Sequence, residues 1–432
     1  MLDILFMSKI KRVIAREILD SRGFPTVEAD VELENGFVGR AAAPSGASTG
    51  IHEALELRDG DASRYLGKGV TKSVQNIVEF LGPAIIGKDS MDFLAVEGAI
   101  IDVDGNMNKS KLGANSTLAV SLAWSKAAAL SESLSYAEWI HDQTKLLGYK
   151  CEMKLPVPLM NVINGGAHAD NGLDIQEFMI VPHGFSSFRE TLRAGVETFH
   201  HLKKILTSRK MITAVGDEGG FAPQLESNEA ALAVLLEAID AAGYKAKEQI
   251  SLALDVASSE FYKDGNYCFR DPSLGRLSAE GLVDFYTQLL GKYPIVSIED
   301  PMSEDDWAGW ELLTKRLGDA VQIVGDDLFV TQCKRLQIGV DKKAANAILI
   351  KLNQVGTLKE TLDTMKLAKD SSFKSIVSHR SGETEDVSLA HLAVATGCGQ
   401  VKTGSASRSD RLAKYNELLR LEELLGCGLA RW

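Results

Sequence analysis

The residues best suited to chemistry lie at the ends of six short β-branched runs in the second half of the chain. The runs span residues 251–255, 295–299, 322–326, 347–351, 375–379 and 400–402, and they end in Asp255, Glu299, Asp326, Lys351, His379 and Lys402. In an α/β barrel the carboxyl ends of the strands meet at one mouth, where active sites lie. One charge at such a position is commonly a loop residue, but six in succession indicate a site of acidic and basic groups.

Three of these residues, Asp255, Glu299 and Asp326, offer carboxylate oxygens from successive runs. Mg²⁺ prefers such hard ligands and keeps some water or substrate oxygens. No cysteine or histidine cluster accompanies them, which argues against zinc. The sequence therefore predicts a magnesium site, and the alternative is a set of exposed salt-bridge acids.

Lys351 ends the apolar run 348–350, so we expect its ammonium beside these acids and the metal. Because a dication and a second lysine, Lys402, disfavour another positive charge, we expect the pKa of Lys351 to be lowered. A neutral amine there can act as a general base. Removing a proton from a carbon beside a carboxylate leaves a multiply charged enolate, which Mg²⁺ and Lys402 would stabilise. The alternative is a lysine that only neutralises the acids.

Two further acids, Glu177 and Glu218, lie in segments that we interpret as loops, residues 173–177 and the glycine-rich 215–220. Two carboxyls held close together can share a proton, which raises one pKa and creates an acid at neutral pH. Either glutamate alone would be interpreted as a turn residue. His168, in the glycine loop 164–168, is a candidate for the leaving-group side of such a reaction.

An anion site is predicted at residues 378–382, where a guanidinium and a hydroxyl, Arg380 and Ser381, are adjacent. The planar fork of an arginine matches phosphate or carboxylate oxygens. The Gly/Ser loop 44–50 is flexible enough to close over a bound anion, although such loops are common and mostly structural.

The elements that position these residues fall into two regions. Apolar and charged residues alternate over Val27–Leu33 and a turn at Asn35-Gly36 follows, which predicts an antiparallel hairpin. Helical patterns over Lys72–Leu81 and Asn115–Leu130 complete a small α+β domain, which we place at residues 8–147. Beyond a breaker at Pro156–Pro158, buried strands alternate with helices, and this predicts a parallel α/β barrel over residues 153–432.

Composition narrows the class of protein. The 432 residues carry a net charge of -12, which argues against a nucleic-acid-binding surface. The five cysteines are dispersed, as expected for reduced thiols in a cytoplasmic protein. No apolar stretch has the length of a membrane span, and residues 1–7 do not resemble a signal peptide, so we expect no membrane insertion.

Several long motifs, in order along nearly the whole chain, resemble those of the enolase family. They are Ala15–Gly23, Ser45–Gly50, Gln176–Met179, Gly216–Gly220, Ser297–Pro301, Ser378–Glu383 and Lys402–Gly404. The resemblance implies an enolase-type α/β (TIM-like) barrel whose first strands depart from regular βα alternation, with an N-terminal α+β cap domain. It also implies a glycolytic lyase that interconverts 2-phosphoglycerate and phosphoenolpyruvate. The sequences of its loops resemble those of bacterial members of the family.

The resemblance assigns roles to matching residues. Lys351 would take the C2 proton, and Glu218 would assist loss of the C3 hydroxyl with Glu177 beside it. Two Mg²⁺ ions would bind, the first at Asp255, Glu299 and Asp326 and the second, arriving with substrate, at Ser48. The phosphate would lie against Arg380 and Ser381, and Gln176, Lys402 and His379 would also contact the substrate. His168 would belong to a loop that closes over it.

Partners also follow from the resemblance alone. It implies a homodimer or an octamer. It also suggests two kinds of partner, an RNA-degrading complex and, for a surface or secreted pool of the protein, plasminogen. The sequence ends in Arg431-Trp432, so we do not expect plasminogen to bind through a C-terminal lysine. Two rival interpretations are a racemase or cycloisomerase of the same superfamily, and a catalytically silent binding protein on the same fold. The phosphate motif argues against the first, and the intact Lys351 and Glu218 argue against the second.

Overall fold

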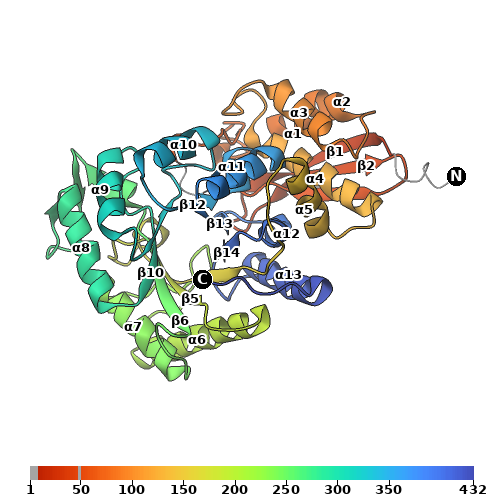
Figure 1. The fold of residues 1–432 in the computed structure, drawn as a ribbon. Coiled ribbons are helices and arrows are strands. Elements are labelled where there is room, and N and C mark those ends of the chain that lie inside the picture. The colour runs from red at the N-terminus through yellow and green to blue at the C-terminus, as the bar shows by residue number, and fades with distance from the viewer. Residues whose placement is uncertain (1–7, 47–49) are drawn as a thin grey trace.

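A computed structural model describes residues 8–46 and 50–432 of the chain. Figure 1 shows a small unit of strands and helices (red to orange) set against a barrel of eight strands that is surrounded by helices. This architecture confirms the predicted fold class, a C-terminal TIM-like barrel with an N-terminal α+β cap.

The cap consists of a three-stranded antiparallel sheet covered by helices. Its strands are β1 (Ile10–Leu19), β2 (Pro25–Leu33) and β3 (Val38–Ala42), and its helices are α1 (Thr71–Asn76), α2 (Gly82–Ile85), α3 (Phe93–Asp104), α4 (Ala114–Ser131) and α5 (Tyr136–Leu146). The predicted hairpin is confirmed by β2 and β3, with Val27, Ala29 and Val31 fully buried. Gly36 closes its turn with φ +90°, a conformation that favours glycine.

Strand β1 was not predicted. Most of its ten residues are half-buried or exposed, so its sequence lacks the strict alternation that marks a one-sided strand. Its position is fixed by antiparallel pairing along nearly the whole of β2.

The barrel is closed in the order β10-β11-β12-β13-β14-β4-β5-β6. Its strands are β4 (Val157–Asn164), β5 (Glu177–Pro182), β6 (Ile250–Asp255), β10 (Ile295–Glu299), β11 (Gln322–Gly325), β12 (Ala347–Ile350), β13 (Lys374–Ser378) and β14 (Gly399–Lys402). Its helices are α6 (Phe188–Ser208), α7 (Asn228–Ala241), α8 (Ala279–Lys292), α9 (Trp307–Leu317), α10 (Cys333–Lys342), α11 (Leu358–Asp370), α12 (Ser388–Thr396) and α13 (Ser409–Leu425). The six predicted runs are therefore barrel strands.

The first strands break the βα rhythm, as the resemblance implied. No α-helix separates β4 from β5, and β5 is antiparallel to both β4 and β6, whereas the other pairs are parallel. The segment Pro156–Pro158, which we interpreted as a breaker, instead leads into β4. Proline is tolerated at the first residues of a strand because few ladder bonds are lost there.

Side chains from alternate strand positions fill the barrel. This inner core is apolar and consists of Val157, Leu159, Met179, Val181, Ala253, Val324, Ala347, Leu349 and Ile376. Beyond β6 a small three-stranded sheet, β7 (Tyr262–Lys263), β8 (Asn266–Cys268) and β9 (Arg276–Leu277), decorates the barrel. A packed interior with chemistry confined to one mouth is typical of this architecture.

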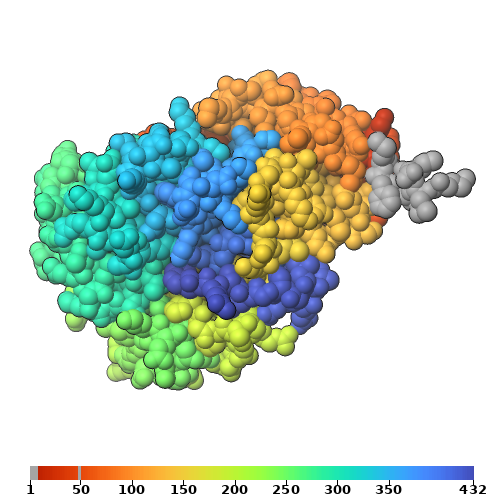
Figure 2. All heavy atoms as spheres, in the orientation of Figure 1, coloured from red at the N-terminus to blue at the C-terminus, as the bar shows by residue number. Residues whose placement is uncertain are grey.

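The connecting segment between cap and barrel lies on the surface, where Figure 2 shows it (yellow) beside the C-terminal part of the chain (blue). Backbone hydrogen bonds between Leu155 and both Gly428 and Ala430 fix this contact. All five cysteines lie in the described part of the chain and are free thiols, as expected. Within the described residues, none of the helices has the length and apolar content needed to cross a bilayer.

Candidate active site

Five of the six strand-end residues line one cavity at the barrel mouth, and Glu299 lies directly beneath it, bonded to Lys402. Each of the six is the last residue of its strand or the residue directly after it. Glu177 joins them because β5 runs antiparallel, so the beginning of β5 lies level with the end of β6, where Glu177 pairs with Asp255. Our interpretation of Glu177 as a loop residue was therefore wrong.

Lys402 lies at the centre of the acids. Its Nζ is 2.9 Å from an oxygen of Asp255, 2.9 Å from Glu299 and 3.3 Å from Glu177. Burial alone would lower the pKa of Lys402, but Asp255 and Glu177 raise it well above its usual value. Lys402 is thus a fixed positive charge at the floor of the cavity.

Lys351 forms an ion pair with Asp326, whose other oxygen accepts a hydrogen bond from Gln354 at 3.0 Å. Burial opposes the charge of Lys351, but the adjacent Asp326 carboxylate outweighs it and the pKa is raised. Our expectation of a lowered pKa was made for acids that are engaged by a metal ion, and it stays a prediction for that state. Here Asp326 interacts with the amine directly.

Glu177, Glu218 and His168 form a compact group in which one ligand atom from each lies within 4.8 Å of the others. Burial, together with Glu218 beside it, raises the pKa of Glu177 well above its usual value. Burial would also raise the pKa of Glu218, but His379 and His168 hold it well below. The pKa values of the two carboxyls are thus pushed in opposite directions, as expected for two acids forced together.

The loop that carries Glu218 is tied to the barrel. Phe221 exchanges backbone hydrogen bonds with the end of β4, and the Asn161 amide donates to Glu218 at 3.1 Å. The Ser381 hydroxyl donates to the other Glu218 oxygen at 3.2 Å. Burial lowers the pKa of His379 well below its usual range, although the adjacent Glu218 carboxylate opposes this shift. These contacts connect the acid pair to the predicted anion site.

Arg380 lines the cavity but is already paired. Its guanidinium donates to both oxygens of Glu53, at 2.8 and 3.2 Å, and to Asn353 at 3.0 Å. Glu53 follows the Gly/Ser loop, whose described end at Ser45 exchanges backbone hydrogen bonds with Gly382. In this structure a carboxylate of the cap therefore pairs with the arginine of the predicted anion site. Ser48 lies outside the described residues.

Gln176 and His168 are the remaining predicted substrate contacts, and both line the cavity. The Gln176 amide donates to Asp255 at 3.4 Å, while its carbonyl oxygen and both ring nitrogens of His168 are buried without a hydrogen-bond partner among the described residues. The His168 Nδ1 lies 3.8 Å from an oxygen of Glu177. Buried polar atoms that lack a partner are costly, so these atoms are available to a ligand.

We did not single out Asp300 from the sequence, although it lines the same cavity. Its carboxylate accepts the backbone N–H groups of Asp326 and Asp327, at 2.8 and 2.9 Å, and so connects the end of β10 to the end of β11. Its backbone has φ +40°, in the left-handed region. The Glu299-Asp300-Pro301 motif was the available signal, but the motif alone gives no partner for the side chain.

The acids fit a divalent cation. Burial and then Asp255 raise the pKa of Glu299 to about 8, and its second oxygen is buried without a partner among the described residues. Excess buried carboxylate of this kind is what a hard dication neutralises. Within the described residues, the group of acids alone that is close enough to share an ion consists of Asp300, Asp326 and Asp327. Of the three predicted ligands, only Asp326 belongs to this group, because Asp255 and Glu299 both contact Lys402 instead.

The open space at the mouth is about 30 Å³, room for roughly one water molecule. Its lining includes the Lys351–Asp326 and Lys402–Asp255 ion pairs and Arg380, whose own partner is Glu53. A substrate with several anionic groups would have to separate these pairs in order to bind.

Comparison with protein-family models matches both halves of the chain. Residues 10–140 match the model described as the enolase N-terminal domain, and residues 152–430 match the model described as the enolase C-terminal TIM barrel domain. The two matches together cover nearly the whole chain.

Proposed function

The chain belongs to the enolase family, and from that premise we propose that it catalyses the reversible dehydration of 2-phospho-D-glycerate to phosphoenolpyruvate. Family membership makes it an enolase-type lyase. The particular substrate and the roles of the residues are inferred from the chemistry of the barrel mouth.

One observation carries the proposal: the candidate base and the candidate acids lie on opposite sides of the same mouth. Lys351 follows β12 and Glu177 begins β5, and these strands are four apart around the eight-stranded ring. Elimination of water requires a base at one carbon and an acid at the neighbouring hydroxyl. Groups placed across the mouth can approach a substrate from two sides without neutralising each other.

Each residue then has a defined task. Lys351 takes the C2 proton, and Glu218 delivers a proton to the departing C3 hydroxyl. Because the pKa of Glu177 is raised and that of Glu218 is lowered in the free protein, this proton has to pass from Glu177 to Glu218 before it is delivered. Lys402 holds its positive charge beside the substrate carboxylate, where negative charge develops. Arg380 binds the phosphate once Glu53 releases it.

Asp255, Glu299 and Asp326 would hold Mg²⁺, with Ser48 available to a second ion that comes with substrate. When bound, the metal would supply concentrated positive charge that stabilises the enolate. With Asp326 engaged as a ligand, Lys351 would no longer have the contact that raises its pKa, which would suit a general base.

The proposal is tested by incubating the purified protein with 2-phosphoglycerate and Mg²⁺ and following phosphoenolpyruvate by its ultraviolet absorbance. We expect turnover that EDTA abolishes and excess Mg²⁺ restores. The Lys351→Ala variant should lose at least about 10²-fold in kcat/KM, because a general base typically contributes that much. It should still bind Mg²⁺, measured by calorimetry.

Lys203→Ala, an exposed lysine on α6, is the matched control and should retain full activity. A 2-hydroxy acid that lacks phosphate should not react. Turnover of the phosphate-free acid in place of 2-phosphoglycerate would contradict the proposal, and substantial activity of Lys351→Ala would refute the role of that lysine.

The same premise supports a homodimeric or octameric assembly acting in the cytoplasm. We propose that the active enzyme has this assembly. Light scattering of the purified protein measures its oligomeric state.

A further inference from the structure

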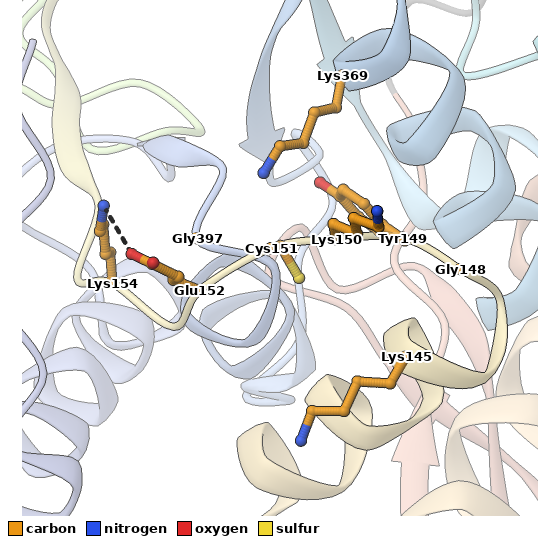
Figure 3. A pocket seen from close by; sticks show the side chains of 9 residues that line it. All are labelled: Lys145, Gly148, Tyr149, Lys150, Cys151, Glu152, Lys154, Lys369 and Gly397. Carbon is orange, nitrogen blue, oxygen red and sulfur yellow. Dashed lines mark ion pairs between the residues drawn. The ribbon is translucent and has the colours of Figure 1, made fainter.

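A second cavity, of about 590 Å³, lies away from the barrel mouth and shares no residue with it. It is formed where the cap, the connecting segment and the barrel meet (Figure 3). Lys145 of α5 and Lys369 of α11 reach it from opposite sides, and Lys150 and Lys154 come from the connecting segment. The volume falls within the range of about 300–1,000 Å³ typical of small-molecule sites.

The charge of this cavity is opposite to that of the protein. Four lysines and one acid, Glu152, line it, in a chain whose net charge is -12. Lys154 is 3.3 Å from Glu152, and Lys145 is 2.7 Å from Asp142, but both pairs are solvent-exposed and weak. Exposed pairs of this kind are easily exchanged for a ligand anion.

Two of the lysines have no acidic partner. Neither Lys150 nor Lys369 forms an ion pair with any carboxylate in the described part of the chain. The Lys369 ammonium lies 5.8 Å from the centre of the Tyr149 ring, and Figure 3 shows it extending toward the tyrosine hydroxyl. The cavity therefore offers two available cations and a hydroxyl.

We propose that this cavity binds a small anion that carries two or more phosphate groups. Lysine ammonium groups are mobile point charges, so they select for density of negative charge rather than for one planar geometry. Because the cavity is open to solvent, screening weakens each contact, and a ligand with several charges is needed to gain affinity. An extended nucleic acid would reach beyond the cavity over a chain whose net charge is -12, which disfavours it.

The location gives the ligand a measurable effect beyond binding. It would contact α5 of the cap and α11 of the barrel together, so it binds only when both are folded and docked. Binding should therefore raise the unfolding temperature of the complete chain, by mass action on the folded state.

The test is isothermal titration calorimetry of the full chain with inorganic triphosphate at low ionic strength, without added divalent cations. We expect saturable binding that weakens at least tenfold in the double variant Lys150→Gln/Lys369→Gln. The matched control is Lys203→Gln/Lys204→Gln, which removes the same charge from exposed lysines on α6. Its affinity should equal that of the wild type, and both double variants should keep full activity toward 2-phosphoglycerate.

Three results would overturn the site. The first is the absence of saturable binding to the wild type, and the second is equal weakening in both double variants, which would indicate non-specific attraction. The third is binding that is lost in Arg380→Gln but kept in Lys150→Gln/Lys369→Gln, which would place the anion at the barrel mouth. Because activity toward 2-phosphoglycerate is measured separately, failure of this site leaves the proposed reaction unaffected.

Discussion

At the scale of single residues, the ion pair between Arg380 and Glu53 neutralises the arginine of the proposed anion site when no substrate is bound. The Arg380 side chain is 3% exposed and that of Glu53 is 7% exposed, so this ion pair is buried. Removing one partner of a buried pair leaves an uncompensated charge, which is strongly destabilising. Glu53 therefore compensates the charge of Arg380 in the free protein, and in our proposal a substrate anion would take its place.

Substituting Glu53 should destabilise the protein, and inorganic phosphate should reverse much of this effect. We expect Glu53→Gln to lower the free energy of unfolding by about 1–3 kcal/mol in phosphate-free buffer, because the guanidinium loses its counter-charge. Inorganic phosphate should restore much of this loss by binding Arg380, and it should stabilise the wild type less. Denaturant unfolding with and without phosphate measures both effects. An equal phosphate effect on the two proteins would show that Glu53 does not occupy the anion site.

At the scale of elements, Asp300 connects two neighbouring strands at the mouth. Its carboxylate holds the backbone at the end of β11, from which the proposed ligand Asp326 projects. Residues behind a metal ligand orient it, and their loss typically reduces metal affinity by about 10–100-fold. The turn after β10 therefore controls the geometry of the ligand after β11.

We predict that Asp300→Asn weakens Mg²⁺ binding by about tenfold, because an amide retains only one acceptor oxygen for the two N–H groups. Asparagine tolerates the left-handed backbone, so the turn itself should persist. Titration of activity against Mg²⁺ concentration measures the shift. Asp319→Asn, at an exposed position before β11, is the control and should leave the titration unchanged. Equal Mg²⁺ dependence in both variants would mean that Asp300 supports only the fold.

At the scale of the whole molecule, the cap and the barrel meet around a buried acid. Glu97 of α3 accepts hydrogen bonds from the Ser121 hydroxyl at 2.6 Å and from the Lys359 N–H at the start of α11, at 2.9 Å. Burial raises the pKa of Glu97 from 4.5 to about 7. Between these values the folded protein keeps a proton that the unfolded chain has released, so the contribution to stability is present below pH 4.5 and is lost as pH rises to about 7.

Glu97→Gln should remove this dependence. We expect the difference in free energy of unfolding, wild type minus variant, to fall by about 3 kcal/mol between pH 4.5 and 7.5, as the shift in pKa requires. Denaturant unfolding at several pH values measures it, since subtracting the variant cancels the other titrating groups. Glu34→Gln, at an exposed position, should show no such trend. A difference that is independent of pH would mean that Glu97 ionises normally in the folded protein.

Much of the fold follows from local pattern. Alternation along β2 and the glycine at its turn predicted the cap hairpin, and the βα rhythm predicted the later barrel strands, because periodicity and turn residues act over a few neighbours. The residues at the strand ends were identified for the same reason, since parallel strands bring their carboxyl ends to one mouth whatever the details of packing.

The sequence by itself determined which chemical groups this protein carries to the mouth of its barrel. Only the tertiary structure decided their partners. Glu53 and Arg380 are 327 residues apart, and Glu177 reaches the mouth only because β5 is antiparallel. Charge states were decided at this level too: the pKa of Lys351 is raised rather than lowered because Asp326 lies against it. Such pairings depend on contacts between distant segments, and the free energy of a buried charge depends on those contacts rather than on its neighbours in sequence.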